Sequence, residues 1–259
     1  MTLELLGANA ALVLALMVTL WLVSVRLRNA SIVDPWWSIA FLLVTGQTIA
    51  RTGTSPAKLL VLTMVSTWAI RLWLHLLVRS VGKPEDPRYA AFRASYGPER
   101  YWWVSFFQVF LLQGVLVVLI SAPLQLSAAA SENDRVTPFD FAGLAVFTAG
   151  FLIELLADAQ LQAFRRNPAN AGKVLDTGLW RLSRHPNYFG ETVIWWGYWL
   201  CALDEPLGSA TFPAPALMTF LLLKVSGVTM LDAHLSATKP AYAEYVRRTS
   251  AFIPRDPRD

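Results

Sequence analysis

Long apolar runs dominate the chain, and short polar segments separate them. The first run, from Leu5 to Val25, holds 21 residues without a charged side chain. A helix of this length crosses about 30 Å of hydrocarbon, the core of a typical bilayer. The runs predict an all-α fold, a polytopic membrane helix bundle that forms one domain over residues 1–259. We expect seven transmembrane helices, at roughly 5–25, 34–50, 58–79, 101–123, 139–164, 187–203 and 211–231.

Charges in the connecting segments predict the orientation of this bundle. Arginine and lysine are frequent after the first, third and fifth runs and in the tail, whereas the opposite segments hold only Arg51, Lys58 and Arg135. Basic segments stay on the cytoplasmic side of a membrane, so we expect the N-terminus outside and the C-terminus in the cytoplasm. Glu4 stands where a signal peptide would be basic, which argues against a cleavable signal.

Composition agrees with a membrane protein and excludes other classes. Hydrophobic residues make up 55% of the chain and charged residues 15%, and the mean hydropathy is +0.43. The single cysteine, Cys201, excludes an intramolecular disulfide. The three histidines lie far apart in sequence, so no metal site is expected. The net charge of +4 follows the membrane segments and does not indicate nucleic-acid binding. Without a Gly-x-Gly-x-x-Gly sequence, a Rossmann domain is excluded.

The segment from Gly178 to Glu191 concentrates polar side chains between two apolar runs. It reads Gly-Leu-Trp-Arg-Leu-Ser-Arg-His-Pro-Asn-Tyr-Phe-Gly-Glu. Pro186 favours the first turn of a helix, where free N–H groups attract an anion. Arg184 adds a guanidinium that suits a phosphate. Two interpretations are open: a basic loop anchored in lipid headgroups, and a binding site for an anionic ligand.

The fifth apolar run ends in a polar face. Ionisable groups inside a span are costly, so they usually face a cavity or a partner. The face is therefore either a salt-bridged helix end or one wall of a cofactor pocket. Its members recur at four, four and three residues and share one side of a helix: Glu154, Asp158, Gln162 and Arg165.

Three stretches together resemble a known superfamily. They are Gly178-Leu179-Trp180 with Arg184-His185-Pro186-Asn187-Tyr188-Phe189-Gly190-Glu191, then Ser31-Ile32-Val33-Asp34-Pro35-Trp36-Trp37, and the tail from Lys239-Pro240-Ala241-Tyr242 to Phe252-Ile253-Pro254. They resemble the steroid 5-alpha-reductase-like membrane proteins, and within these an uncharacterised bacterial branch related to the sterol C14 and C7 reductases. The shorter Arg-His-Pro-x-Tyr-x-Gly core also occurs in isoprenylcysteine carboxyl and phospholipid methyltransferases. The motif therefore identifies the superfamily better than the reaction.

The resemblance implies an NADPH-dependent reductase in a bacterial inner membrane, with its cofactor site facing the cytoplasm. Residues 138–259 would bind the cofactor, and residues 1–130 would face the substrate. NADPH is expected to bind more tightly than NADH, because arginines such as Arg247 and Arg248 suit the additional phosphate of NADPH. The alternative interpretation of the tail is a solvated amphipathic helix on the membrane surface. By resemblance, the cofactor-binding residues are Asp158, Gln162, Arg165, Trp180, Arg184, His185, Asn187, Tyr188, Glu191, Asp232, Lys239, Tyr242 and Tyr245.

The residues expected to face the substrate differ from those of the animal steroid 5-alpha-reductases. Those enzymes carry a Gln-Glu pair in an early span, whereas Gln47 here has no glutamate beside it. Reduction of an enone needs an acid or hydrogen-bond donor at the carbonyl. The candidate catalytic residues are the intramembrane polar groups Asp34, Arg71 and His75. His75 is the candidate proton donor, whereas Asp34 and Arg71 could instead form a structural ion pair. The polar connector at 83–100 is interpreted as a linker.

Three functions remain open. The leading hypothesis is reduction of a carbon–carbon double bond in a steroid-like or other enone lipid. The first alternative is a membrane methyltransferase that uses S-adenosylmethionine, although Leu231-Asp232-Ala233-His234 lacks the Glu-Glu pair of that group. The second is a sterol- or lipid-binding membrane protein without catalysis. Expected partners are a lipophilic small molecule and membrane lipids, with no nucleic acid and no obligate protein partner.

Overall fold

A computed structural model describes residues 2–130, 135–225, 228, 232 and 242–257 of the chain. The chain divides into two compact units, residues 1–137 and residues 138–259, and each is described by itself. Within the described residues every regular element is helical, which confirms the all-helical prediction.

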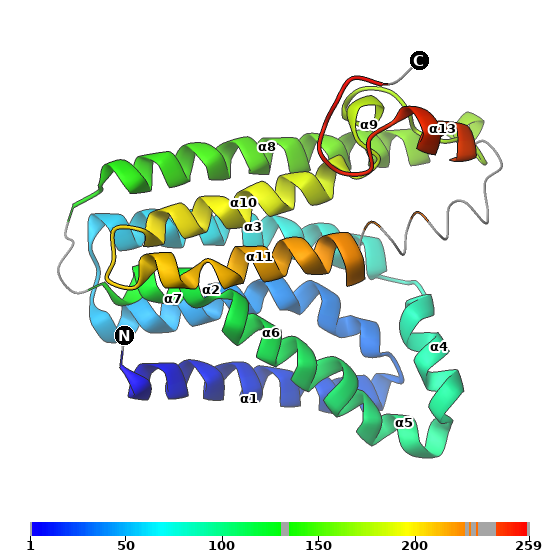
Figure 1. The fold of residues 1–259 in the computed structure, drawn as a ribbon. Coiled ribbons are helices and arrows are strands. Elements are labelled where there is room, and N and C mark those ends of the chain that lie inside the picture. Colours follow the sequence, from blue (N-terminus) through cyan, green and yellow to red (C-terminus); the bar gives the residue numbers. More distant parts are fainter. Residues whose placement is uncertain (1, 131–134, 226–227, 229–231, 233–241, 258–259) are drawn as a thin grey trace. The chain divides into compact units, whose positions relative to one another are not determined.

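Unit 1 consists of helices whose starts follow local sequence signals (Figure 1). The side chains of Thr2 and Ser55 accept hydrogen bonds from the backbone N–H groups of Leu5 and Lys58 and so cap α1 and α3. Proline opens α3, α4 and α5, where its missing N–H has no partner to lose. The elements are α1 (Leu3–Leu27), η1 (Ala30–Ile32), α2 (Val33–Thr52), α3 (Pro56–Ser80), α4 (Pro87–Tyr96), α5 (Pro98–Ser105), the π-helical η2 (Phe106–Leu111), α6 (Leu112–Ile120) and α7 (Ala122–Ala129).

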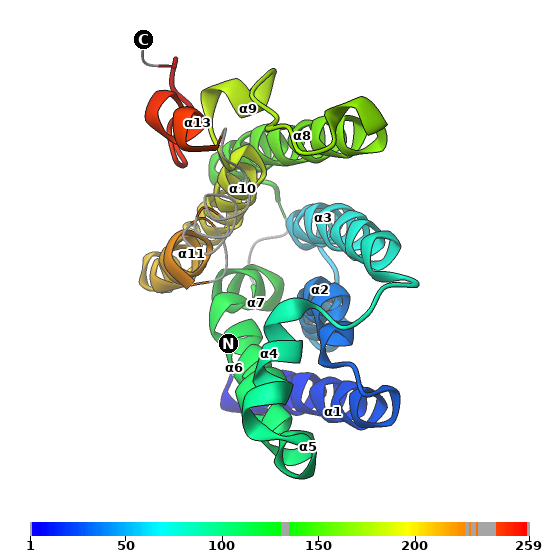
Figure 2. The ribbon, with the colours of Figure 1, turned by 90° about the vertical axis from the view of Figure 1, so that its right-hand side faces the viewer.

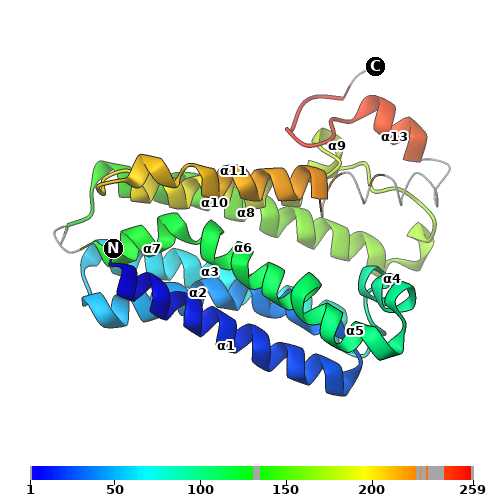
Figure 3. The ribbon, with the colours of Figure 1, turned by 60° about the horizontal axis from the view of Figure 1, so that its bottom comes forward.

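A closed set of polar side chains lies inside unit 1, where α2 packs against α1 and α7 (Figure 3). Asn9 donates to Thr48 Oγ1 at 2.8 Å and to Gln125 Oε1 at 2.9 Å. Gln47 donates to Asn9 Oδ1 at 2.8 Å, and Gln125 donates to Ser121 Oγ at 2.8 Å. Asn9 and Thr48 are completely buried. We call these five residues the Asn9 network; it joins three helices through hydrogen bonds between side chains.

The polar connector at 83–100 folds into α4 and the start of α5 and is bonded to the turn before α2. Glu85 accepts a hydrogen bond from the backbone N–H of Ala30 at 2.7 Å and pairs with Arg93 at 2.8 Å. Asp86 caps α4, and its own N–H donates to Ser31 at 3.1 Å. The segment is therefore a fixed part of unit 1 and more than a linker.

Unit 2 is built on two long helices that lie side by side, α8 and α10, with α11 on the other side of α10 (Figure 2). The short helices α9 and α13 lie together at one end of the unit (Figures 1 and 3). The elements are α8 (Pro138–Arg166), η3 (Pro168–Asn170), α9 (Leu179–Leu182), α10 (Pro186–Ala202), η4 (Gly208–Thr211), α11 (Pro213–Phe220), the π-helical η5 (Leu221–Val225) and α13 (Tyr242–Arg248).

Two pairs of glycines let α8 and α10 touch backbone to backbone. A Cβ atom on Gly150 would lie 2.7 Å from the carbonyl oxygen of Gly190, and one on Gly197 would lie 2.9 Å from the carbonyl oxygen of Gly143. Small residues allow such close approach of helices in membranes. Because both contacts are rigid, they fix the register of α8 against α10.

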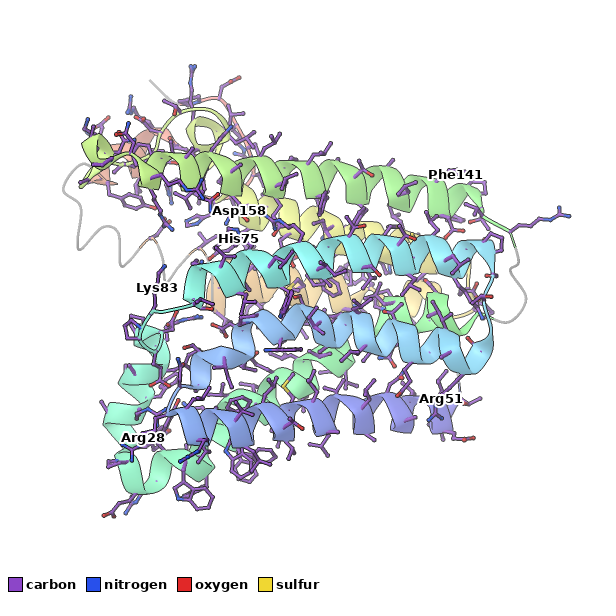
Figure 4. The ribbon with its side chains drawn as sticks, turned by 180° about the vertical axis from the view of Figure 1, so that it is seen from behind. Arg28, Arg51, His75, Lys83, Phe141 and Asp158 are labelled. Carbon is purple, nitrogen blue, oxygen red and sulfur yellow. The ribbon has the colours of Figure 1, made fainter. Side chains whose placement is uncertain are left out.

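Five helical segments are long and apolar enough to cross a membrane: Leu3–Leu27, Pro56–Ser80, Pro98–Ile120, Pro138–Arg166 and Gly208–Val225. They coincide with five of the seven predicted spans. Helices also form at the other two predicted spans, as α2 and α10, but neither is among these five candidates. Figure 4 places Arg28 and Lys83 at one end of unit 1 and Arg51 at the other. The span count of seven and the orientation stay predictions.

Candidate functional site

Asp232 is the centre of a polar cluster in unit 2. Its Oδ2 accepts a hydrogen bond from Arg184 Nη2 at 2.7 Å, and its Oδ1 lies 2.9 Å from His185 Nε2. The hydroxyl of Tyr242 also donates to Oδ1. Three residues predicted by resemblance to bind the cofactor therefore converge on a fourth. We call Arg184, His185, Asp232 and Tyr242 the Asp232 cluster.

The cluster holds Asp232 as a carboxylate. Burial alone would raise the pKa of Asp232, but the hydrogen bonds from His185, Arg184 and Tyr242 outweigh burial and hold it well below its usual range. The pKa of Tyr242 is raised far above its usual value by burial and by its hydrogen bond to this carboxylate. At neutral pH the centre of the cluster is therefore an anion and the phenol is a donor.

Arg184 also connects this cluster to the last helix. Its Nη1 donates to the backbone carbonyls of Val246 at 3.2 Å and Thr249 at 2.7 Å. Carbonyls at a helix C-terminus lack partners within the helix, and a cation there is favourable. The guanidinium thus has an acid on one side and the end of α13 on the other. In this structure its charge stabilises protein groups.

His185 is completely buried at the start of α10. Its ring stacks on Tyr188 with 5.6 Å between ring centroids and 3° between ring planes. Its backbone N–H donates to Ser183 Oγ at 3.1 Å. The second ring nitrogen, Nδ1, is buried and has no hydrogen-bond partner within the part of the chain that the structure describes.

Helix α8 is bonded to the short helix α9 and to the first turn of α10. Asn187 donates to Asp158 Oδ1 at 3.2 Å, and the indole of Trp180 donates to the carbonyl of Ala157 at 3.0 Å. Tyr245 donates from α13 to the carbonyl of Trp180. Five of the predicted residues, Asp158, Trp180, Asn187, Tyr188 and Tyr245, thus lie in contact with the Asp232 cluster or with the loop that carries it.

The C-terminal tail is bonded along the same loop. The backbone N–H of Arg184 donates to the carbonyl of Ser250, and that of Arg255 donates to the carbonyl of Leu182, both at 2.9 Å. Ser183 Oγ donates to the carbonyl of Phe252 at 2.7 Å. These three bonds hold residues 250–255 against the loop that precedes α10.

Three further predicted cofactor residues lie elsewhere in unit 2. Gln162 and Arg165 are exposed near the end of α8. Glu191 is buried within α10 and accepts from Trp195 Nε1 at 2.9 Å. Lys239 lies outside the described residues. Figure 4 shows Asp158 on α8, well along the helix from Phe141 at its start.

The predicted substrate residues belong to unit 1. Asp34 accepts from the hydroxyl of Tyr89 at 2.6 Å and pairs with Arg88 at 3.1 Å, both on α4. Arg71 and His75 lie half-buried on α3. The sequence does not single out Tyr89, because this residue lies in the polar connector. A signal was present all the same, since a carboxylate at the start of an apolar helix needs a hydrogen-bonding partner.

Exposed basic residues surround the loop and tail of unit 2, which suits an anionic ligand. Arg247 is paired with Glu244, and Arg248 lies 3.6 Å from Asp176, so part of this charge is balanced. Within the described residues, no group of three acidic, histidine or cysteine side chains is placed to hold a metal ion. The exposed basic residues are Arg165, Arg166, Lys173, Arg181, Arg247, Arg248 and Arg255.

Comparison with known proteins gives a family and two relatives. The family model described as "Protein of unknown function (DUF1295)" matches residues 20–249. The chain is 27% identical to an uncharacterized protein of Schizosaccharomyces pombe, over 91% of this chain and 76% of that protein. It is 28% identical to the Probable O-methyltransferase ustE of Ustilaginoidea virens, over 54% of this chain and 44% of that protein. Because the family model matches most of its length, the chain belongs to DUF1295, a steroid 5-alpha-reductase-like membrane family.

Proposed function

We propose that this protein is a membrane-embedded, NADPH-dependent reductase of a carbon–carbon double bond in a lipophilic enone. The observation that carries the proposal is the Asp232 cluster. It gathers four of the residues that resemblance assigns to cofactor binding in unit 2, which otherwise consists largely of apolar helices. Polar and ionisable side chains collected in a membrane protein in this way usually serve a ligand or a reaction.

The charges of unit 2 suit NADPH in a specific way. Arg184 has an acidic partner in Asp232, so it is engaged within the protein. The phosphates would instead meet exposed arginines such as Arg166 and Arg181. A charge-assisted hydrogen bond is worth about 1.5–3 kcal/mol, which predicts roughly a tenfold or larger preference for NADPH over NADH. Asn187 and His185 would then lie nearer the reacting ring than the phosphates.

Unit 1 holds the candidate residues for the lipophilic substrate. Asp34, Arg71 and His75 are its candidate residues, and Tyr89 joins them through its hydrogen bond to Asp34. The side chain of Asp34 is 28% exposed, so a polar end of a lipophilic molecule can reach it. We assign the protein to a bacterial inner membrane, with the cofactor site on the cytoplasmic side, where reduced nucleotides are found.

O-methyl transfer is the second candidate function, because a relative that matches about half of the chain carries the name Probable O-methyltransferase. S-adenosylmethionine is a cation at its sulfur, so the carboxylates Asp158 and Asp232 would suit it better than the exposed arginines do. A lipid-binding protein without catalysis is the third.

Ligand binding separates these candidates. The purified protein in mild detergent is titrated with NADPH, NADH and S-adenosylmethionine in a calorimeter. The proposal requires binding of NADPH, roughly tenfold weaker binding of NADH, and NADPH oxidation with at least one member of a panel of lipophilic enones. Binding of S-adenosylmethionine alone would replace the reductase with the methyltransferase, and binding of none would leave the lipid-binding protein.

A matched pair of variants locates the nucleotide. Arg181→Gln removes an exposed charge of unit 2, and Arg51→Gln removes one of unit 1. NADPH affinity is expected to fall roughly tenfold in Arg181→Gln and to stay unchanged in Arg51→Gln. Equal effects of the two substitutions would argue against phosphate binding at the loop of unit 2.

A further inference from the structure

One nitrogen of His185 is buried and without a hydrogen-bond partner in the described part of the chain, whereas the rest of the ring is held in place. Nε2 faces Asp232, one ring face stacks on Tyr188, and the backbone N–H is bonded to Ser183. An unsatisfied buried polar group costs about 1–3 kcal/mol. Such a cost in a native structure calls for an explanation, and a catalytic role is one of the common ones.

The partners of His185 determine which ring nitrogen carries the hydrogen. Asp232 is a carboxylate because its pKa is held well below the usual range. A carboxylate only accepts hydrogen bonds, so Nε2 must carry a proton in either charge state of the ring. Nδ1 therefore presents a lone pair when the ring is neutral and an N–H when it is charged. The second proton of the ring can therefore be gained or lost only at Nδ1.

We propose that Nδ1 of His185 transfers the proton in the reaction at this site, a role that the sequence pattern suggested for His75. The inference rests on the proposed reductase function. The carbon–carbon double bond gains a hydride at its beta carbon from the reduced nicotinamide, which is oxidised. The alpha carbon gains the proton of Nδ1–H. The ring is left neutral and takes its next proton from water.

The surroundings of the ring fit this role. Acid–base catalysis needs a group held in one orientation, and a base oriented by a third group is the usual arrangement. Asp232 orients the ring, and Arg184 and Tyr242 hold Asp232. Because Arg184 balances the charge of Asp232, the pair leaves little net charge beside the imidazole. Tyr188 is stacked on the face of the imidazole.

The tautomer is testable without any substrate. The protein is labelled with 15N in its three histidines and studied by NMR in detergent micelles, with His75→Gln and His234→Gln used to assign the signals. At high pH we expect the His185 ring to carry its hydrogen on Nε2, and on lowering the pH we expect the new proton on Nδ1. A ring that carries its hydrogen on Nδ1 at high pH would overturn the proposal.

His185→Gln tests the reaction itself. Glutamine places an amide N–H near the position of Nε2, which keeps a donor for Asp232, but it has no atom that titrates. General acid–base catalysis contributes about 10²–10⁴-fold, so kcat for enone reduction should fall at least roughly a hundredfold. NADPH affinity should change only slightly, and the loss of activity at high pH should disappear from the pH profile. A kcat within about threefold of the unmodified protein, or a greater loss in His75→Gln, overturns the proposal.

Failure of the reductase function would be recognised separately. If the protein instead methylates phenols from S-adenosylmethionine, Nδ1 accepts the hydroxyl proton while the S–CH₃ bond breaks and the O–CH₃ bond forms. Activity then rises with pH, the opposite of the reductase profile, and this limb is again expected to be lost in His185→Gln. If neither enones nor phenols react, the reductase proposal and the proton transfer by Nδ1 both fail, whereas enone reduction that persists in His185→Gln overturns the role of Nδ1 alone. Retained melting temperature and a monodisperse elution profile confirm that the variants fold.

Discussion

The Asn9 network of unit 1 and the Asp232 cluster of unit 2 are both polar groups among apolar helices, but they differ in completeness. Asn9 uses both of its amide hydrogens and its oxygen, on Thr48, Gln125 and Gln47. The Asp232 cluster satisfies its carboxylate and its guanidinium yet leaves His185 Nδ1 without a partner in the described residues. A closed network is sufficient for joining helices, whereas the unsatisfied nitrogen of the Asp232 cluster supports the proposed ligand site.

Removal of Asp232 should have the largest effect on stability. Asp232→Ala leaves Arg184, at 10% side-chain exposure, without its acidic partner. Breaking a buried ion pair costs about 3–5 kcal/mol, and the partial exposure of Asp232 puts the expected loss at the lower end. Thermal unfolding in detergent would measure it. Asp232→Asn is the control, because it keeps the shape and an acceptor for Arg184 but removes the charge, and unchanged stability in this variant would attribute the loss in Asp232→Ala to shape rather than to charge.

Disruption of the glycine contact between α8 and α10 should have the second-largest effect on stability. Gly190→Ala puts a Cβ 2.7 Å from the backbone nitrogen of Glu154, so α8 and α10 must separate. Overpacking of this kind costs about 1–3 kcal/mol. The same separation pulls Asn187 away from Asp158, so NADPH binding should weaken together with stability. Gly46→Ala in α2 is the matched control: nothing lies within 4 Å of the added carbon, and stability should be equal or higher.

Substitution in the Asn9 network should lower the stability by a smaller amount. Asn9→Leu leaves the partners of Asn9 without their shared residue, and hydrogen bonds between membrane helices average about 0.6 kcal/mol each. We expect a loss of about 1–2 kcal/mol in unfolding experiments. Ligand affinity should not change. Weakened NADPH binding in this variant would contradict the division into a structural network and a ligand site.

The smallest expected effect is a difference in stability at acidic pH. The folded pKa of Asp232 is depressed, so its contribution to stability is complete above the unfolded value of about 4 and is lost as the pH falls through the folded value. The unmodified protein should therefore lose stability below about pH 4, and Asp232→Asn should lose less over the same range. Melting temperatures measured between pH 3 and 7 would test this. Parallel curves for the two proteins would exclude Asp232 as the titrating group.

The sequence alone predicts the helices, but it does not predict which distant residues pair with one another. Apolar runs and capping residues such as Thr2 and Ser55 predict where helices begin, because these signals are local. The pairing of Arg184 with Asp232 joins residues 48 positions apart, and no local pattern encodes it. The contact between α8 and α10 was predictable in part, since Gly143 and Gly150, like Gly190 and Gly197, recur at one side of a helix.

The site residues show the same limit. Resemblance selected Arg184, His185 and Tyr242, and these do come together around Asp232. It could not show that Arg184 is already neutralised within the protein, because charge balance depends on tertiary contacts. Tyr89 was overlooked, since a residue in a polar connector gives no periodic signal.

The bonds between the tail and the loop have a consequence for biosynthesis. Leu182 and Ser183 find their partners at Arg255 and Phe252, about seventy residues later in the chain. A chain emerges from the ribosome N-terminus first, at about 5–20 residues per second, so α8 and α10 are complete several seconds before these partners exist. During that interval the loop before α10 lacks these partners, and a translation that stops after α11 yields a chain in which the loop cannot form its bonds to residues 250–255.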